Sequence, residues 1–353
     1  MTDIPLFVAG YGGVAKSLLR MVAENRDAIA ARTGKYLRLA GLSNSRRYLL
    51  DLQGLPVGPG LAGSLMDAGL PVAGNAFVEK LKTLSVPGAV FVDCTASAEI
   101  ALCYADLFRA GFNVVACNKI AFAQPYAAYR ALKEAAVANG ASLRYETTVC
   151  SALPVLETIN RLVCCGDKVL KVEAVLSGTL SFLFNTYRGG TDGQTFADVV
   201  RQAQAKGFTE PDPRLDLSGR DVFRKLLILS REAGVPLEAE EIVMRPLVPA
   251  SCFEGTVDDF YRSLEALEPQ FAADWEAARA AGKVQKFLAR LEWTDAGYKA
   301  SIGLCLVDPS HPLGTGGSGA VIQSELYRNP IIILGTGAGA DNTASGVLND
   351  ILM

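Results

Sequence analysis

The feature that most constrains the fold is a glycine-rich turn near the N-terminus. A short apolar run, residues 6–9, ends in Gly10-Tyr11-Gly12-Gly13-Val14-Ala15, and an amphipathic stretch with helical spacing follows. In a strand–turn–helix unit, the first glycine allows a tight turn, the second lets a pyrophosphate approach, and a small third residue permits close packing. We expect dinucleotide phosphates to bind at the helix start near Gly13 and Val14. The alternative is a glycine turn with no ligand.

Strand-like and helical segments alternate up to about residue 147, which predicts a Rossmann-type, doubly wound parallel sheet. The expected strands are 37–42, 89–92, 113–117 and 142–147, and the expected helices are 97–110 and 126–139. Residues 55–74 are rich in glycine and proline, so we expect a loop there.

After Pro154 the pattern changes to α+β. Helices are expected at 156–162, 182–187 and 196–206, with a long helix from about residue 218 and a last helix at 343–352. Strands are expected at 169–176, 284–291, 298–306, 320–327 and 331–334. Several of these strands lie close together in the sequence, which favours an antiparallel or mixed second sheet.

Composition excludes several classes of protein. The 353 residues carry 34 basic and 37 acidic side chains, a balance that argues against a nucleic-acid partner. One histidine, His311, excludes multi-histidine metal sites, and eight cysteines without a C-x-x-C pair make zinc unlikely on pattern grounds. The sequence shows no basic apolar leader and no apolar run of membrane-spanning length, so we expect a cytoplasmic protein with no membrane partner.

The end of the second expected strand bears on cofactor choice. An acid there would accept a hydrogen bond from the ribose hydroxyl of NAD, but the residues are Ser43-Asn44-Ser45-Arg46-Arg47. Nothing in this segment repels a 2′-phosphate, and the two arginines could pair with it. The sequence therefore favours NADP(H), with NAD(H) possible. The alternative is that both arginines are solvated loop residues.

The densest polar chemistry lies in residues 207–225. Asp221 and Lys225 are four residues apart and share one helical face. A purely structural interpretation makes Ser218 the N-cap, Asp221 an acid of the first turn and Lys225 its ion-pair partner. Against it, Glu210, Asp212 and Asp216 crowd a proline-stiffened loop, where they would repel one another unless they met a cationic ligand.

Five segments together resemble the homoserine dehydrogenase family across nearly the whole chain. They are GFTEPDPRLDLSGRDVFRKLLILSREAG at 207–234, GYGGVA at 10–15, DCTAS at 93–97 with ACNK at 116–119, LSGTLSFLFN at 176–185, and GTGAGADNTASGV at 335–347. The resemblance implies reversible NAD(P)H-dependent reduction of L-aspartate 4-semialdehyde to L-homoserine, in threonine, methionine and isoleucine biosynthesis. It also implies an NADP(H)-binding domain, 1–137 with 335–353, and a substrate-binding, catalytic and dimerisation domain, 138–334.

The resemblance also assigns site residues. Lys225 and Lys119 would face the reacting oxygen, with Asp221 beside Lys225. The expected substrate residues are Glu210, Asp216, Gly178 and Thr179. The expected cofactor residues are Gly10, Gly12, Gly13, Val14, Asn44, Ser45, Arg46, Thr95, Lys119 and Gly339. A homodimer or higher homo-oligomer is expected.

A monovalent cation, Na⁺ or K⁺, is a further implication of the resemblance. It would be held mostly by backbone carbonyls, at positions that correspond to Glu146, Val149, Ser151 and Leu153. The family segment reads V-G-A-G-L-P, whereas this chain has Cys150 and Ala152 in place of the two glycines. If either position needs a positive φ, the carbonyls could point elsewhere.

Two rival functions remain open on sequence grounds. One is a phosphorylating semialdehyde dehydrogenase that forms a thioester on Cys150, with His311 as the only available base. The other is a cofactor-sensing module without catalysis. Many relatives carry a regulatory or kinase domain that this sequence lacks, so we also expect no response to threonine beyond weak competition with homoserine.

Overall fold

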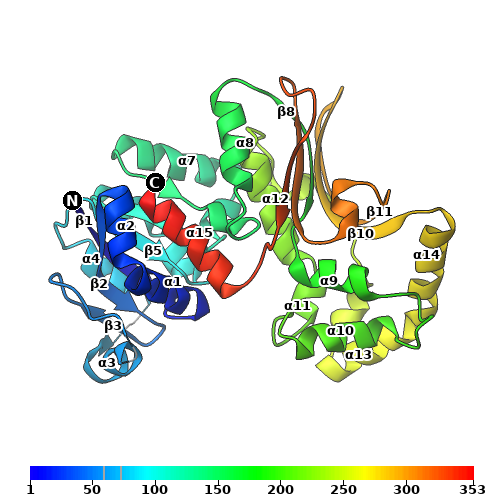
Figure 1. The fold of residues 1–353 in the computed structure, drawn as a ribbon, viewed down its shortest axis with the longest axis horizontal. Coiled ribbons are helices and arrows are strands. Elements are labelled where there is room, and N and C mark those ends of the chain that lie inside the picture. Colours follow the sequence, from blue (N-terminus) through cyan, green and yellow to red (C-terminus); the bar gives the residue numbers. More distant parts are fainter. Residues whose placement is uncertain (59, 72–73) are drawn as a thin grey trace. The chain divides into compact units, whose positions relative to one another are not determined.

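The computed structural model describes residues 1–58, 60–71 and 74–353 (Figure 1). The chain divides into two units, Met1–Ala152 with Gly339–Met353, and Leu153–Ala338. These boundaries differ from the expected ones chiefly at residues 138–152, which belong to the first unit. The reason is that β7 (Leu143–Arg144) pairs with β6 (Asn113–Ala116) in the sheet of that unit.

The first unit is built on a parallel sheet, as expected. In the described residues the strand order is β4-β3-β2-β1-β5-β6-β7. The parallel strands are β1 (Thr2–Ala9), β2 (Lys35–Ser43), β5 (Val90–Asp93), β6 and β7, and an antiparallel edge is formed by β3 (Arg47–Leu50) and β4 (Leu70–Pro71). The Rossmann-type expectation is therefore confirmed.

Helices flank this sheet. They are α1 (Gly13–Glu24), α2 (Arg26–Thr33), α3 (Leu61–Ala68), α4 (Ala76–Leu81), α5 (Ala98–Ala101), α6 (Tyr104–Arg109), α7 (Tyr126–Ala138) and α15 (Ala340–Leu352), with the 3₁₀ turns η1 (Ala121–Ala123) and η2 (Glu146–Thr148). The last helix, α15, packs against α1 (Figure 1). Its apolar face, Ala344, Val347 and Ile351, is buried in the same core as Leu6, so the C-terminal segment completes the first unit.

Three local expectations in this unit are wrong. Residues 55–74 contain α3 and β4 rather than only loop. The helix expected at 97–110 is interrupted between α5 and α6. The strand expected at 142–147 ends after two residues and turns into η2, where the Thr148 hydroxyl donates to the Tyr145 carbonyl. Side chains that bond to nearby backbone compete with strand pairing in this way.

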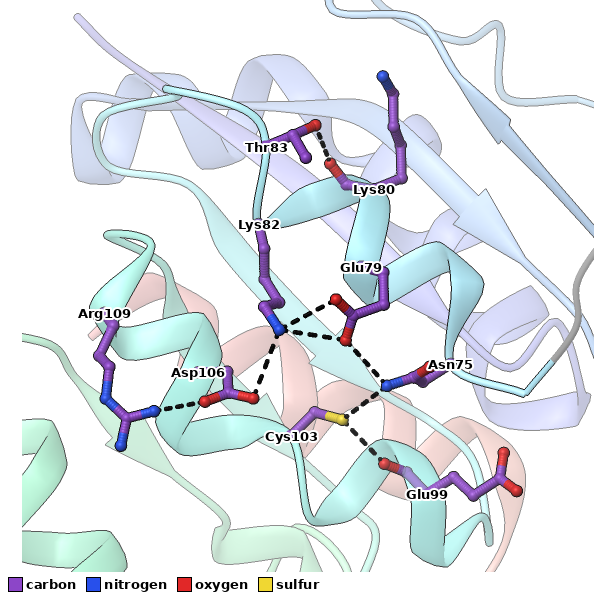
Figure 2. A network of polar contacts seen from close by, with 9 residues as sticks. All are labelled: Asn75, Glu79, Lys80, Lys82, Thr83, Glu99, Cys103, Asp106 and Arg109. Atoms are coloured by element: carbon purple, nitrogen blue, oxygen red, sulfur yellow. Dashed lines mark hydrogen bonds and ion pairs between the residues drawn. The ribbon is translucent and has the colours of Figure 1, made fainter.

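A polar network joins α4 to the α5–α6 segment (Figure 2). The ammonium of Lys82 lies 3.0 Å from Glu79 and 3.5 Å from Asp106. Asn75 donates to Glu79 and to the thiol of Cys103, which in turn donates to the Glu99 carbonyl. The ion-paired side chains of Lys82, Glu79 and Asp106 are 31–50% exposed, so each ion pair adds little stability. The network joins α4 to the segment that follows β5, and it includes none of the expected site residues.

The second unit contains a mixed sheet, which confirms the α+β expectation. In the described residues its order is β13-β12-β8-β10-β11-β9, antiparallel except where β9 pairs with β11. The strands are β8 (Val169–Val175), β9 (Ile242–Met244), β10 (Val284–Thr294), β11 (Gly297–Val307), β12 (Ser318–Ser324) and β13 (Ile331–Gly335).

The helices of this unit are α8 (Val155–Cys164), α9 (Gly178–Thr186), α10 (Phe196–Ala205), α11 (Arg214–Leu217), α12 (Arg220–Glu232), α13 (Val257–Ala266) and α14 (Glu268–Ala280), with 3₁₀ turns η3 (Ala239–Glu241), η4 (Ala250–Phe253) and η5 (Pro312–Thr315). Helices α8 and α12 pack on the sheet. Across the helices of the described chain, none has the length and apolar character needed to cross a lipid bilayer.

Candidate active site

The glycine turn of the first unit is closed by the neighbouring strands. Gly10 has a φ of 90°, and a Cβ there would lie 2.8 Å from both the Cys94 carbonyl oxygen and Thr95 Cγ2. The backbone N–H groups of Gly10 and Tyr11 both donate to the Ser43 carbonyl at the end of β2. Only glycine fits this position, because a side chain would have to occupy the space of the residues that follow β5.

The next turn residues leave room for a ligand. A Cβ at Gly12 would meet nothing within 4 Å, and α1 begins at Gly13 with no side-chain cap at Gly12. The first backbone N–H groups of α1, including those of Gly13 and Val14, therefore face an open space at the positive end of the helix. This geometry fits the pyrophosphate of a dinucleotide.

The segment after β2 is ordered by Asn44. Its side-chain oxygen accepts hydrogen bonds from the backbone N–H groups of Arg46 and Arg47, each at 2.8 Å. Arg47 lies on β3, and its guanidinium donates to the Gly69 carbonyl at 2.6 Å, so it has a structural task. Arg46 is exposed. The two arginines therefore differ in their surroundings, because the guanidinium of Arg47 is engaged by the backbone of another segment and Arg46 lies at the surface.

A buried carboxylate organises the carboxyl ends of β5 and β6. Asp93 accepts hydrogen bonds from the Tyr104 hydroxyl at 2.6 Å, the Thr95 N–H at 2.7 Å and the Asn118 amide at 3.1 Å. Burial raises the pKa of Asp93 above its ordinary value, and the hydrogen bond from Tyr104 opposes that shift. The sequence reasoning missed this residue, although a lone acid directly after the apolar run 90–92 is a visible signal.

Asp93 thereby fixes two of the expected site residues. Thr95 is held through its backbone, and Asn118, which donates to both Asp93 and the Thr95 hydroxyl, directly precedes Lys119. The pKa of the Cys117 thiol is lowered, first by its hydrogen bond with Cys94 and also by the charge of Lys119. Lys119 itself lies three residues beyond the end of β6, directly after the anchored Asn118.

In the second unit, Lys225 reaches from α12 to the end of β8. Its ammonium lies 2.6 Å from Asp221 Oδ2 and donates to the Leu176 carbonyl at 2.7 Å. The lysine side chain is 12% exposed and that of Asp221 is 51% exposed. Since Leu176 directly precedes the N-terminal turn of α9, the ammonium lies at the entrance to Gly178 and Thr179.

The expected N-cap at Ser218 is wrong. The cap of α12 is Gly219, in the left-handed conformation with φ 69°. The Ser218 hydroxyl donates to the Leu215 carbonyl, and it accepts a hydrogen bond from the Arg220 N–H at 3.3 Å from outside the cap position. Glycine suits this position because of its positive φ; a Cβ there would lie 2.5 Å from Met244 Cε, the end of a flexible side chain that would have to shift.

Thr179 and Asp216 are brought into direct contact. The Thr179 hydroxyl lies 2.8 Å from Asp216 Oδ1 and 2.6 Å from the Phe208 carbonyl. The backbone N–H of Glu210 donates to Asp216 Oδ2 at 2.9 Å, and the Glu210 side chain is exposed. The start of α9, Gly178 and Thr179, therefore lies next to Asp216 and the backbone of Glu210.

The expectation that the acids of this segment repel one another is wrong in part. Asp212 is neutralised by a bidentate contact with Arg214, whose hydrogen bonds lower the pKa of the carboxyl. Asp216 lies on the short helix α11 and is hydrogen-bonded as described, rather than in an open loop. Glu210 keeps an exposed carboxylate, and in the described part of the chain no cationic side chain forms an ion pair with it.

The segment expected to hold a cation adopts an unusual backbone. Cys150 and Ser151 both have φ 57°, so Cys150 keeps the left-handed conformation at a position where the family has glycine. The Ser151 hydroxyl lies 3.0 Å from that of Thr343, and the Glu146 N–H donates to Asp350. Val149 precedes this turn with an extended φ, and Leu153 is the first residue of the second unit.

Side-chain metal sites of the usual kind are not found. In residues 1–58, 60–71 and 74–353, no group of three or more His, Cys, Asp or Glu side chains is arranged to hold a metal ion.

The rival thioester chemistry finds little support in this geometry. Cys150, its candidate nucleophile, is fully buried. His311 accepts a hydrogen bond from the Leu313 N–H through Nδ1, and its Nε2 lies 3.4 Å from Glu173. Both ring nitrogens are therefore engaged within the second unit, so His311 is not available as a base for Cys150.

The sequence of this chain matches the models of two protein domains. Residues 10–146 match the model of the family described as "Homoserine dehydrogenase, NAD binding domain", and residues 154–352 match that described as "Homoserine dehydrogenase". The parallel sheet with its glycine turn in one unit and the lysine–carboxylate pair in the other agree with these two matches, which describe one class of protein. The chain belongs to the homoserine dehydrogenase family.

The curated relatives differ in the share of their own length that this chain covers. The chain is 37% identical to bifunctional aspartokinase/homoserine dehydrogenase 2 of Escherichia coli over 99% of this chain but 43% of the relative. It is 30% identical to a homoserine dehydrogenase of Schizosaccharomyces pombe, over 99% of this chain and 95% of the relative. A hyperthermophilic archaeal homoserine dehydrogenase in complex with NADPH shares the fold, with a TM-score of 0.74 at 20% identity over 99% of this chain and 97% of the other.

Proposed function

We propose that this chain catalyses the reversible, NADP(H)-dependent reduction of L-aspartate 4-semialdehyde to L-homoserine. The observation that carries the proposal is the position of the Lys225 ammonium, held between Asp221 and the Leu176 carbonyl at the start of α9. The chain spans less than half the length of the first curated relatives that it matches, so the reaction is assigned from its own site.

Lys225 is the group proposed to handle the proton. The cofactor, when bound, supplies or accepts the hydride at the carbon that carries the oxygen. A lysine ammonium has a reference pKa of about 10.4, so it is charged at neutral pH and can donate to an alkoxide-like oxygen. Such general acid catalysis typically contributes about 10²–10⁴-fold. Asp221 orients the ammonium, and Lys119 is the second lysine proposed to face the same oxygen.

The acids near α9 are proposed to hold the amino-acid end of the substrate. Glu210 has an exposed carboxylate that can pair with the substrate ammonium. Asp216 is positioned by Thr179 and by the Glu210 N–H, and a carboxylate retains further acceptor sites after two hydrogen bonds. Gly178 adds a surface without a side chain at this end of α9.

The cofactor is proposed to bind the first unit with a preference for NADP(H). Gly10, Gly12, Gly13 and Val14 would surround the pyrophosphate. Asn44, Ser45 and Arg46 would meet the 2′-phosphate, because no acid is present there and it is Arg47, not Arg46, that the Gly69 carbonyl engages. Thr95, Lys119 and Gly339 are proposed for the nicotinamide side.

A monovalent cation, Na⁺ or K⁺, is proposed at the carbonyls of Glu146, Val149, Ser151 and Leu153. The support is the retained left-handed backbone at Cys150, which keeps the turn despite the lost glycine. Carbonyl oxygens without a carboxylate cluster suit a singly charged, hard cation.

A homodimer is proposed through the second sheet. Its edge strand β13 exposes Ile332 and Leu334, and the preceding loop exposes Leu326 and Tyr327. Exposed apolar side chains on an unpaired edge strand favour association with a second copy. A cytoplasmic location is proposed because all eight cysteines are free thiols, two of them exposed.

The test is a product analysis. Purified protein with L-aspartate 4-semialdehyde and NADPH should form L-homoserine, identified by mass spectrometry, and neither prior thiol alkylation nor the substitution Cys150→Ala should abolish it. Formation of an acyl phosphate in the presence of phosphate and NADP⁺, with loss after alkylation, would instead support the thioester enzyme. A protein that binds NADPH without turnover would be a cofactor sensor.

A further inference from the structure

A basic cavity lies in the second unit, away from the expected substrate residues. It has a volume of about 670 Å³, and its lining residues come from α9, α14, the start of β10 and the segment before β12. That size is typical of small-molecule sites. Four cationic side chains line it, and among the described residues of its wall none carries a carboxylate. The cations are Arg188, Arg279, Lys283 and Lys286.

Lys286 is the most informative of these residues. It is only 3% exposed, and its ammonium contacts the side-chain oxygen of Asn185. An ammonium has three donors, and a buried charge is costly unless an opposite charge meets it. Burial accordingly lowers the pKa of Lys286 from its ordinary value. The contacts of Lys286 within the described chain thus leave this cation with a neutral partner.

The orientation of Asn185 is fixed by its neighbours. Its amide nitrogen donates to the Ser181 hydroxyl at 3.2 Å, and that hydroxyl donates to the Gly317 carbonyl at 3.2 Å. Gly316, with φ 104°, lies against the same amide, and a Cβ there would come within 3.1 Å of it. The cavity wall around Lys286 is therefore built by specific contacts rather than by loose surface side chains.

The other three cations differ in whether a carboxylate pairs with them. Arg279 pairs with Glu276 and Lys283 pairs with Asp308, each at 2.6 Å. Arg188 donates to the Tyr187 carbonyl, and the described residues give it no carboxylate. Arg188 and Lys286 therefore leave two positive charges uncompensated at one cavity.

We propose that this cavity binds a small dianion, namely a phosphate group, free or carried as a phosphate ester. A phosphate monoester carries nearly two negative charges at neutral pH and presents several acceptor oxygens, which match an arginine fork and a lysine ammonium. Trp275 lines the same cavity and offers an apolar surface to the remainder of an ester. This site is separate from the one proposed for the reaction.

Trp275 also provides the measurement. The chain has two tryptophans, so a Trp293→Phe background leaves Trp275 as the only one. Inorganic phosphate and phenyl phosphate are titrated in turn, with tryptophan fluorescence as the readout and saturating NADP⁺ present so that the glycine turn is occupied. The expected result is saturable quenching; tighter binding of phenyl phosphate would identify an ester as the ligand, and equal or weaker binding would identify free phosphate.

Variants separate this site from a general charge effect. Lys286→Met and Arg188→Gln should each weaken phosphate binding by about tenfold or more, since a charge-assisted hydrogen bond is lost. Lys299→Met, an equal charge change at an exposed position of β11, should leave it unchanged. Circular dichroism checks the fold of the Lys286 variant, and Arg188, being exposed, gives an independent reading. No saturable signal in the parent protein, or an affinity unchanged from the parent in both cavity variants, would overturn the proposal.

Discussion

The ammonium of Lys225 lies 2.6 Å from the carboxylate of Asp221, one turn earlier on the same face of α12. This is the ion pair that a purely structural interpretation predicts. The same ammonium also donates across to the Leu176 carbonyl at the end of β8. The pair therefore does not leave the lysine in solvent but holds it at the start of α9, so the structural and catalytic interpretations are compatible.

Replacing Lys225 should affect the chemical step. Lys225→Ala is expected to lower kcat by at least about 10²-fold, because the proton donor to the reacting oxygen is lost. Affinity for NADPH should change little, since Lys225 belongs to the second unit. Steady-state kinetics and NADPH binding measure the two effects. Turnover close to that of the parent protein would restrict Lys225 to its ion pair.

Two neighbouring acids, Glu210 and Asp212, should differ in their contribution to KM for homoserine. Glu210→Gln is expected to raise KM for homoserine more than it lowers kcat, since it weakens the grip on the substrate ammonium. Asp212→Asn is the matched control, because that carboxylate is engaged by Arg214. Its KM should stay near the parent value. If KM rises equally in both variants, Glu210 does not contact the substrate.

Arg46 should determine part of the cofactor preference. Arg46→Ala is expected to narrow the ratio of kcat/KM for NADPH over NADH, because a charge-assisted bond to a phosphate is worth about 1.5–3 kcal/mol. Arg32→Ala, another exposed arginine of the first unit, should leave the ratio unchanged. An unchanged ratio in the Arg46 variant would move the discrimination to Ser45 or to the backbone.

Asp93 should matter for stability as well as for the site. Asp93→Ala leaves the buried Tyr104 hydroxyl without its acceptor and removes one acceptor of the Asn118 amide, which should lower the free energy of unfolding by about 2–4 kcal/mol. Asp106→Ala removes an acid of the exposed network in Figure 2 and should cost much less. Denaturant unfolding compares the two variants; equal losses would contradict the organising role of Asp93.

The raised pKa of Asp93 gives this carboxyl a defined pH signature. A folded-state pKa above the unfolded value means that the native protein binds the proton more tightly, so the contribution to stability is full at low pH. It is lost as the pH rises from about 4 through the folded pKa. Asp93→Asn lacks this titration, so its stability relative to the parent should increase over that interval. A difference in unfolding free energy that stays constant from about pH 3 to about pH 7 would refute the raised pKa.

Strong local patterns could be predicted from the sequence. The glycine turn, the alternation of strands and helices in the first unit and the α15 segment follow from periodicity and turn chemistry. The second sheet is expected to be antiparallel or mixed, and its β9–β11 pair is indeed parallel. The N-cap of α9 is Ser177, whose hydroxyl accepts from the Leu180 N–H. Helix α9 therefore begins at Gly178, earlier than the expected start at residue 182.

Other features depend on contacts that a linear pattern does not contain. The pairing of Arg47 with the Gly69 carbonyl joins residues 22 positions apart, and it removes one of two candidate phosphate ligands. The engagement of Asp212 by Arg214 removes a charge from the supposed acidic cluster. The role of Asp93 as the shared acceptor of Tyr104 and Asn118 depends on contacts between residues 11 and 25 positions apart.

The most direct test of the proposed function is turnover of L-homoserine with NADP⁺ by the purified chain. We expect homoserine-dependent formation of NADPH by the parent protein, with L-aspartate 4-semialdehyde as the product, and a loss of about 10²-fold or more in Lys225→Ala. Absence of homoserine-dependent NADPH formation in a folded protein that binds NADP⁺ would contradict the proposed function.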